Sequence, residues 1–278
     1  MNNENENWNA SFKSSCLDGR IRSNSGAQKI DFNSWIFDKV SIPKGAEVLE
    51  LCCGTGNQTL EIARIIGNGG RIVALDLEQA SLEKTKDKLS LFQGELTLIC
   101  RNIDETNSAL EEIGKSKNSF DMVFVSYGLY YSEEPKKLLD ELVKWLKPSA
   151  SIVVVGPHGK NNSHLFRLLE QSGVSMSYFS TWSSSKFMYE VVIPWCSEHF
   201  TLINLNNITN EVIWESPKEV ENYWNNTIFF DKSRKLEVRK NLKSYFEKTN
   251  KFNRAINHNK KHLDENNIFI FGIKPNFP

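Results

Sequence analysis

The sequence of 278 residues has no excess of charge and no long apolar run. Lysine and arginine number 34, and so do aspartate and glutamate, so the chain lacks the net positive charge that drives binding to nucleic-acid phosphates. No apolar run approaches the ~20 residues of a membrane span, and the N-terminus lacks the basic and apolar regions of a secretory signal. We therefore expect a cytoplasmic protein with neither a membrane nor a nucleic-acid partner, and a homodimer is compatible with the sequence.

The sequence also lacks a cysteine framework. Its cysteines are few, odd in number and without the spacing of a zinc site or of paired disulfides: Cys16, Cys52, Cys53, Cys100 and Cys196. They indicate reduced thiols, and we expect no metal site. Cys53 is in addition interpreted as a small residue that packs in the interior.

What is present is a regular alternation of strands and helices. Short, nearly uninterrupted apolar runs, typical of strands covered on both faces, occur at residues 46–51, 71–76, 95–100, 120–126 and 151–156. Helical periodicity follows the first, second and fourth runs, and Ser132 is the predicted N-cap of the last of these helices. This alternation predicts a doubly wound, mostly parallel α/β sheet with right-handed crossovers.

The last third of the chain has a different pattern. We expect two further strands, at about 200–208 and 266–274, which would complete a seven-stranded sheet, and helical insertions that cover the active site. The predicted division is an N-terminal segment at 1–30 that is partly flexible or a lid, a cofactor-binding core at 31–172, and an acceptor cap with the last two strands at 173–278.

The turn after the first strand carries the main functional signal. Glu50 ends a buried strand, and Gly54-Thr55-Gly56 follows, which places the turn where open α/β sheets bind ligands. The third glycine of the dinucleotide fingerprint is replaced by Thr59, and Glu50 would repel a pyrophosphate but attract a cation. A second acid, Asp76, ends the second strand, where it can accept ribose hydroxyls.

The stretch Glu-Leu-Cys-Cys-Gly-Thr-Gly at 50–56 resembles the first motif of class I S-adenosylmethionine-dependent methyltransferases. The resemblance extends over roughly residues 30–157 and is closest to the menaquinone and ubiquinone biosynthesis type. It includes Asp76 and the stretches at 101–104, 120–129 and 145–156. Cys52 replaces the first glycine of the motif, and Asn102 stands where an aspartate is common.

The resemblance implies a Rossmann-like fold, with S-adenosyl-L-methionine as cofactor and S-adenosyl-L-homocysteine as product. Glu50 would face the methionine ammonium, Asp76 would hold the ribose and Leu77 would lie against the adenine. Asn102 would contact the adenine amino group. The complete implied set is Glu50, Cys52, Cys53, Gly54, Thr55, Gly56, Asp76, Leu77, Asn102, Ile103, Ser126 and Tyr127.

Residues for the methyl acceptor are less sharply indicated. His158 follows the fifth strand and could act as a catalytic base, and an exposed loop histidine is the alternative. The aromatic residues that could form the acceptor pocket or pack in a core are Tyr130, Tyr131, Trp182, Tyr223 and Trp224.

Three functions are compatible with these observations. The first is methyl transfer, by in-line displacement, to an O, N or C atom of a small-molecule metabolite. The second is methylation of RNA or protein, against which the neutral charge and the aromatic C-terminal insertions argue. The absence of an Asn/Asp-Pro-Pro-Tyr/Phe motif argues in addition against methylation of the exocyclic amines of nucleic-acid bases. The third is an NAD(P)-dependent oxidoreductase on a Rossmann sheet, which Glu50 and the missing third glycine disfavour.

Overall fold

The computed structural model describes residues 13–200, 203–249, 251–253 and 267–268. These residues form two compact units. The sheet unit comprises the described residues of 32–156 and 187–207, and the helical unit comprises those of 13–31, 157–186 and 208–268. Nothing in the described residues forms a helix long and apolar enough to cross a membrane.

The sheet unit is built on a parallel sheet of five strands, in the order β3-β2-β1-β4-β5. The strands are β1 (Glu47–Leu51), β2 (Arg71–Asp76), β3 (Glu95–Cys100), β4 (Phe120–Ser126) and β5 (Leu146–Val155). The central strand β1 is buried along its whole length, as a parallel strand covered on both faces should be. The five strands and their parallel doubly wound arrangement predicted from the sequence are confirmed, although β5 begins at Leu146 and not at residue 151.

The register aligns the carboxyl ends of the strands at one edge. Leu51 of β1 pairs with Leu75 on one side and Val125 on the other. Asp76 pairs with Cys100 at the end of β2 and β3. Residues that follow these strands therefore gather at one edge of the sheet, which is where open α/β sheets bind ligands.

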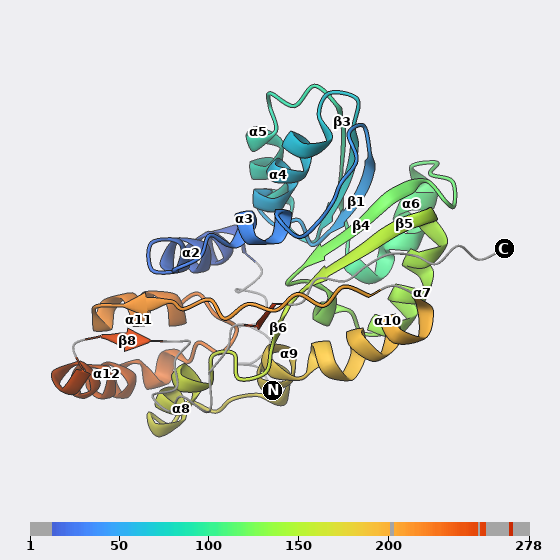
Figure 1. Ribbon diagram of the computed structural model, residues 1–278. Helices are drawn as coiled ribbons and strands as arrows, with labels where there is room; N and C mark the ends of the chain where they lie inside the picture. Colours follow the sequence, from blue (N-terminus) through green and yellow to red (C-terminus); the bar gives the residue numbers. More distant parts are fainter. Residues whose placement is uncertain (1–12, 201–202, 250, 254–266, 269–278) are drawn as a thin grey trace. The chain divides into compact units, whose positions relative to one another are not determined.

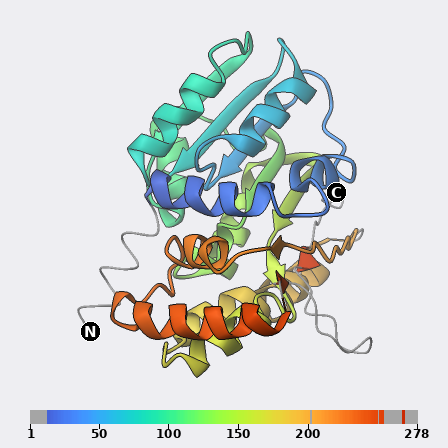
Figure 2. The ribbon, with the colours of Figure 1, turned by 90° about the vertical axis from the view of Figure 1, so that its left-hand side faces the viewer.

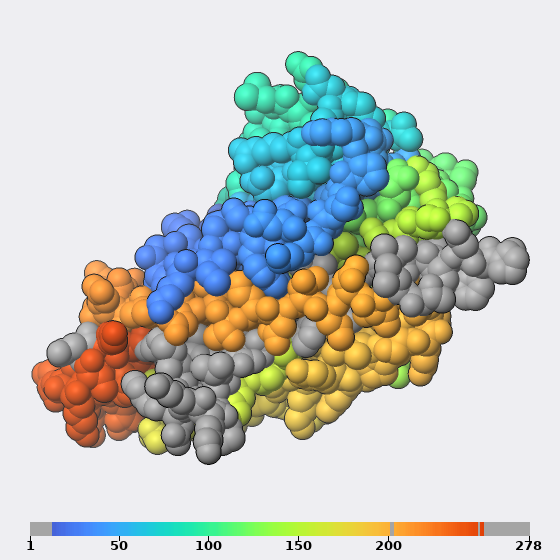
Figure 3. All heavy atoms as spheres, in the orientation of Figure 1, coloured from blue at the N-terminus to red at the C-terminus, as the bar shows by residue number. Residues whose placement is uncertain are grey.

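Helices lie on both faces of this sheet. In Figure 1, α4 and α5 lie on one face and α6 and α7 on the other, and Figure 2 shows α4 and α5 in front of the strands. The cyan and teal atoms of the segment that includes β2 and α5 form a continuous surface in Figure 3. The helical elements of this unit are α3 (Phe32–Phe37), α4 (Asn57–Ile66), α5 (Gln79–Lys88), η1 (Ile103–Glu105), α6 (Thr106–Glu112), η2 (Leu129–Tyr131), α7 (Pro135–Trp145), η3 (Met188–Val192) and α10 (Ile193–His199).

The start of α7 corrects one expectation. Ser132 is not its N-cap, because the helix begins at Pro135, and proline is favoured in the first turn of a helix. The Ser132 hydroxyl instead donates to the carboxylate of Asp104, which also accepts the Glu133 amide at 2.9 Å. The serine therefore ties the segment before α7 to η1.

The helical unit has its own apolar core. Trp214, Trp224 and Phe252 are fully buried in it, together with apolar residues of α8 and α12. Two short antiparallel pairs, β6 with β9 and β7 with β8, complete the unit. Its elements are α2 (Ser14–Ser25), β6 (Pro157–His158), α8 (Ser163–Gln171), α9 (Tyr178–Ser185), β7 (Ile213–Trp214), α11 (Pro217–Trp224), η4 (Lys232–Arg234), α12 (Lys235–Thr249), β8 (Phe252–Asn253) and β9 (Asn267–Ile268).

The expectation of seven strands in one sheet is wrong for the described residues. Residues 203–208 of the strand predicted at 200–208 form no strand, and Leu205 is exposed. Of the strand predicted at 266–274, only Asn267–Ile268 is described, and it pairs with β6 rather than with the main sheet. Alternating apolar residues make a segment able to form a strand, but a strand also needs a neighbour whose backbone is free to bond.

The predicted domain division stays a prediction. Within the N-terminal segment predicted at 1–30, residues 1–12 lie outside the described residues, and α2 occupies much of the rest.

Candidate functional site

The candidate site begins with a buried carboxylate on the central strand. Glu50 is the penultimate residue of β1, where it pairs with Ala74 of β2 and Phe124 of β4, and it is 2% exposed. Its Oε2 atom makes no hydrogen bond to the described residues. A buried carboxylate oxygen without a donor is costly, and such an atom calls for an explanation.

The electrostatic surroundings of Glu50 disfavour its ionised form. Burial raises the pKa of Glu50 to about 8, and the negative charge of Asp76 adds to the rise. The Thr59 hydroxyl lies close enough to lower this pKa in part, although Thr59 Oγ1 and Glu50 Oε2 do not meet hydrogen-bond geometry. No positive side chain acts on this pKa among the described residues. A cationic ligand beside Glu50 would favour the ionised form of this carboxylate and supply the positive partner that it lacks.

The turn after β1 has an unusual backbone. Cys52, Gly54 and Gly56 have φ angles of 55°, 55° and 76°, all in the left-handed region. Glycine adopts this region readily, whereas cysteine is strained in it. The cysteine is accommodated by Gly128 after β4, since a Cβ atom built at Gly128 would lie 2.6 Å from Cys52 Sγ.

Asp76 fixes the turn from the neighbouring strand. One of its carboxylate oxygens accepts the Gly54 amide at 2.8 Å and the other accepts the Glu78 amide at 3.0 Å. Burial raises the pKa of Asp76, and these amides oppose the rise. A carboxylate has about four acceptor positions, so two hydrogen bonds leave acceptor capacity on Asp76 for ligand hydroxyls.

Thr85 of α5 holds the same turn, and no sequence pattern had indicated this residue. Its hydroxyl lies 2.9 Å from the Gly54 carbonyl oxygen and 3.1 Å from that of Ser81, and its side chain is fully buried. A Cβ atom built at Gly56 would lie 2.7 Å from Thr85 Oγ1, so the helix packs directly on the glycine. Thr85 is 31 residues from Gly54, and only the folded structure brings them together.

Aromatic side chains gather after β4. Tyr127 has a φ of 54°, and this backbone conformation is rare for an aromatic residue. Its ring packs edge-on against Phe32 at 5.8 Å. The rings of Tyr130 and Tyr131 lie 4.7 Å apart, and Tyr130 packs edge-on against Phe187. Backbone strain of this kind is common at functional sites, and here it directly follows Ser126.

The residues implied for adenine lie after β2 and β3. Leu77 is 52% exposed, an unusual exposure for a leucine next to a buried strand. The Asn102 side chain accepts the Asp104 amide at 3.0 Å and so caps η1, while the side chain of Ile103 is buried. All the residues implied for the cofactor therefore belong to the sheet unit and lie at the end of β1, β2 or β4 or in the segments that follow β1, β2, β3 and β4.

The remaining predicted residues belong to the helical unit. His158 is fully buried in β6, and burial lowers the pKa of its imidazole to about 3. Trp182 is half-buried on α9 beside Phe179. Tyr223 and Trp224 pack in the apolar core of the unit, which gives both a structural role. Their roles with an acceptor stay predictions.

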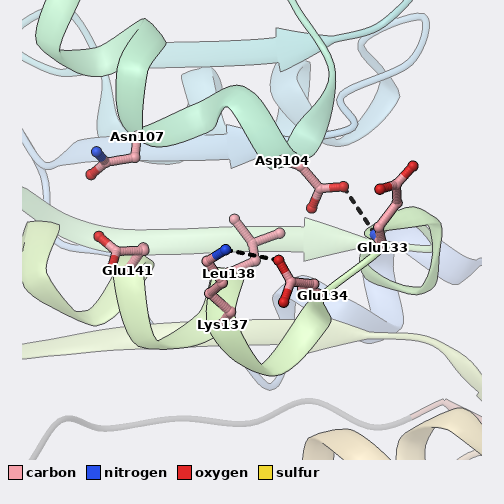
Figure 4. Close-up of a pocket in the computed structure, with 7 residues that line it drawn as sticks. All are labelled: Asp104, Asn107, Glu133, Glu134, Lys137, Leu138 and Glu141. Carbon is pink, nitrogen blue, oxygen red and sulfur yellow. Dashed lines mark hydrogen bonds and ion pairs between the residues drawn. The ribbon is translucent and has the colours of Figure 1, made fainter.

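A small cavity of about 140 Å³ lies between η1, α6 and the start of α7 (Figure 4). Its charged groups are mostly acidic, and Lys137 pairs with Glu134 at 2.8 Å. The described residues contain no group of three or more histidine, cysteine, aspartate or glutamate side chains suited to a metal ion. The residues that line the cavity are Asp104, Asn107, Glu133, Glu134, Lys137, Leu138 and Glu141.

A doubly wound sheet with a glycine turn and acidic residues at the ends of β1 and β2 defines a Rossmann-like α/β protein of the methyltransferase type. Comparison with protein families makes the assignment specific. Residues 27–170, just over half of the chain, match the ubiE/COQ5 methyltransferase family, and the chain belongs to this family. The resemblance predicted from residues 50–56 and their neighbours is confirmed.

Individual relatives agree with this family. The chain is 31% identical to the demethylmenaquinone methyltransferase of Lactococcus lactis over an alignment of 111 residues. This alignment covers 40% of this chain and 42% of the relative. The chain is 30% identical over 118 residues to the ubiquinone/menaquinone biosynthesis C-methyltransferase UbiE of Haemophilus ducreyi, covering 42% and 44%. The aligned part thus spans less than half the length of these curated relatives.

A solved structure supports the fold over a longer stretch. A Bacillus halodurans protein described as a candidate methyltransferase matches with a TM-score of 0.58 at 14% identity, over 88% of this chain and 99% of that one. At this identity the match shows the fold alone.

The contact between Cys52 and Gly128 gives a first prediction. Gly128→Ala should lower the free energy of unfolding by about 1–3 kcal/mol, because the added methyl group overlaps the Cys52 side chain. In a Cys52→Gly background the same change should cost clearly less, since the overlapping atoms are gone. Urea denaturation of the two single variants and the double variant measures the coupling. Additive effects would contradict the proposed contact.

The buried imidazole gives a second prediction. The pKa of His158 is lower in the folded protein than its ordinary 6.5, so the folded state binds this proton more weakly than the unfolded state. The contribution of the neutral, buried imidazole to the free energy of unfolding is fully present above pH ~6.5 and is lost as the pH falls towards 3. The loss between pH 7 and pH 5 should be on the order of 1–2 kcal/mol.

Urea denaturation of the wild type and His158→Gln at pH 7 and pH 5 tests this expectation. The wild type should lose more stability than the variant, because the variant has no imidazole to protonate. Equal losses in the two proteins would show that His158 titrates normally and is not buried in a neutral form.

Proposed function

We propose that the protein transfers a methyl group from S-adenosyl-L-methionine to a carbon atom of a small aromatic acceptor of the reduced-quinone class. The observation that carries the proposal is the buried Glu50 carboxylate, which has one oxygen without a hydrogen-bond donor at the end of the central strand. The cofactor's amino acid part carries an ammonium group that could complete this carboxylate. A pyrophosphate would instead meet uncompensated negative charge.

The residues of the turn fit such a cofactor. Glu50 would face the ammonium, and the left-handed backbone at Gly54 and Gly56 lets the chain approach the ligand without side chains in the way. Asp76 keeps acceptor capacity for the ribose hydroxyls. The exposed Leu77 offers an apolar surface to the adenine, with Asn102 as a polar partner.

When bound, S-adenosylmethionine supplies a methyl group that is already activated on a positively charged sulfonium. Because the departing group is a neutral thioether, no side chain has to donate a proton to it. The residues of the chain have to align the acceptor carbon with the methyl group and to exclude water. Ser126 and Tyr127 are the proposed residues beside the reacting centre.

The acceptor class rests on the relatives and on the aromatic residues after β4. The relatives are named as demethylmenaquinone and quinone-biosynthesis C-methyltransferases. Carbon attack on an electrophilic methyl group needs an electron-rich ring, and this favours the reduced quinone over the oxidised form. Tyr130 and Tyr131 are proposed to contact the ring, since aromatic faces and edges pack favourably.

The helical unit contributes the remaining assignments. Trp182, Tyr223 and Trp224 remain proposed acceptor-pocket residues, and the division into a cofactor-binding core at 31–172 and an acceptor cap at 173–278 remains part of the proposal. His158 remains the proposed proton acceptor, with the limit that its low pKa makes it a weak base.

A ligand panel tests the proposed cofactor. At about one hundred times its Kd, S-adenosylhomocysteine should raise the melting temperature by about 5–10 °C, because it binds only the folded protein. NAD and NADP should give no shift. 5′-Methylthioadenosine, which keeps the nucleoside but lacks the ammonium, should bind far more weakly. A shift with NAD rather than S-adenosylhomocysteine would overturn the proposal. Turnover is then measured as S-adenosylhomocysteine formed with reduced demethylmenaquinone.

Asp76 gives a further prediction for the same site. Asp76→Ala should raise the Kd of S-adenosylhomocysteine by about 30- to 1,000-fold, since two charge-assisted hydrogen bonds to the ribose are lost. Asp121→Ala is the matched control: Asp121 accepts the Glu47 amide at 2.8 Å and Lys147 at 2.7 Å at the amino end of β4.

Calorimetry should give a Kd within about threefold of the wild type for Asp121→Ala, because the amino edge of a parallel sheet is not the ligand edge. Equal effects of the two substitutions would mean that Asp76 acts through the stability of the sheet and not through the ligand.

A further inference from the structure

Thr59 stands out among the threonines of the described residues. It is the third residue of α4, in the position where a dinucleotide-binding turn has its third glycine, and its side chain is fully buried. Its hydroxyl makes no hydrogen bond to the described residues. Glycine in this position allows a helix to pack closely, so a buried polar side chain here needs a reason of its own.

Three other buried threonines satisfy their hydroxyls on nearby backbone. Thr85 Oγ1 lies within hydrogen-bond distance of the Gly54 and Ser81 carbonyl oxygens. Thr106 donates to Ile103, and Thr227 to Trp224 at 2.7 Å. This is the usual solution for a threonine within or beside a helix. Thr59 does not use it.

The Glu50 carboxylate is the other buried side-chain group without a hydrogen-bond partner among the described residues of the sheet unit. Thr59 is the side chain whose hydroxyl favours the ionised form of Glu50, and Glu50 Oε2 is buried without a donor. The other titratable groups that act at this position are Asp76, Cys52 and Cys53. Asp76 opposes the ionisation of Glu50, and burial raises the pKa of both thiols, so neither cysteine offers a positive charge.

We propose that Thr59 is a positioning residue that turns its hydroxyl to the Glu50 carboxylate and holds it, charged and oriented, for the ammonium group of the cofactor. The inference rests on the proposed function for the identity of the ligand. It adds a specificity device: the residue that departs from the dinucleotide fingerprint supports the acid that rejects a pyrophosphate. A threonine that merely filled space in the first turn of α4 would leave Glu50 unaffected.

The test separates the hydroxyl of Thr59 from its volume. Thr59→Val keeps the shape and removes the hydroxyl, whereas Thr59→Ser keeps the hydroxyl. Thr227→Val is the control, since it removes a hydroxyl from a buried threonine of the helical unit. Two readouts are measured: the titration of Glu50 by ¹³C NMR in the ligand-free protein, assigned with Glu50→Gln, and the Kd of S-adenosylhomocysteine between pH 6.5 and 8.5.

In Thr59→Val the midpoint of the Glu50 titration should rise by about one pH unit, a shift that corresponds to a tenfold change in equilibrium. The Kd at pH 7 should then rise about tenfold. The ratio of the Kd of the variant to that of the wild type should become smaller at higher pH, where a larger fraction of Glu50 is ionised in both proteins. Thr59→Ser and Thr227→Val should follow the wild type in both readouts.

The outcomes distinguish this inference from the proposed function. An unchanged Glu50 midpoint in Thr59→Val would overturn the role of Thr59, whatever the ligand. A Kd raised equally at every pH would overturn it too, because that result indicates loss of shape and not of charge. A shifted midpoint in a protein that does not bind S-adenosylhomocysteine would retain the Thr59–Glu50 pair and overturn the cofactor assignment.

Discussion

The structure of the site depends on one costly arrangement, the burial of the Glu50 carboxylate at the end of β1. Burial of a charge without a partner is unfavourable, and a protein gains nothing for its stability from it. Neighbouring Asp76 makes the arrangement worse, because it adds negative charge at the same edge of the sheet. Such an arrangement is understandable where a positive ligand supplies the missing partner and so favours the ionised carboxylate.

The backbone around Glu50 is strained as well. Cys52 and Tyr127 both hold left-handed conformations that side chains disfavour, at the ends of two adjacent strands. The structure retains them because the surroundings fix the chain on several sides. Asp76 binds the Gly54 amide, Thr85 reaches the Gly54 carbonyl oxygen, and Gly128 leaves room for Cys52. The strain is thus held by ordinary hydrogen bonds and packing from α5 and from the segment after β4.

Family and fold do not by themselves define the reaction. The family match covers residues 27–170, and the individual relatives align over less of the chain. The helical unit, with its separate apolar core around Trp214 and Trp224, lies largely beyond those alignments. The acceptor therefore has to be argued from chemistry, since one fold supports many reactions by variation of the segments added to it.

The sequence by itself determined the five strands, their parallel direction and the acidic residues at the ends of β1 and β2. These features follow from local apolar runs, from the alternation of strands with helices and from residues next to the runs in the chain. It could not determine which strands would pair, and the two extra strands expected in the main sheet do not join it in the described residues. Nor could it identify the roles of Thr85 and Gly128. Those roles depend on contacts between residues far apart in the chain, and only the packing of helices on the sheet decides them.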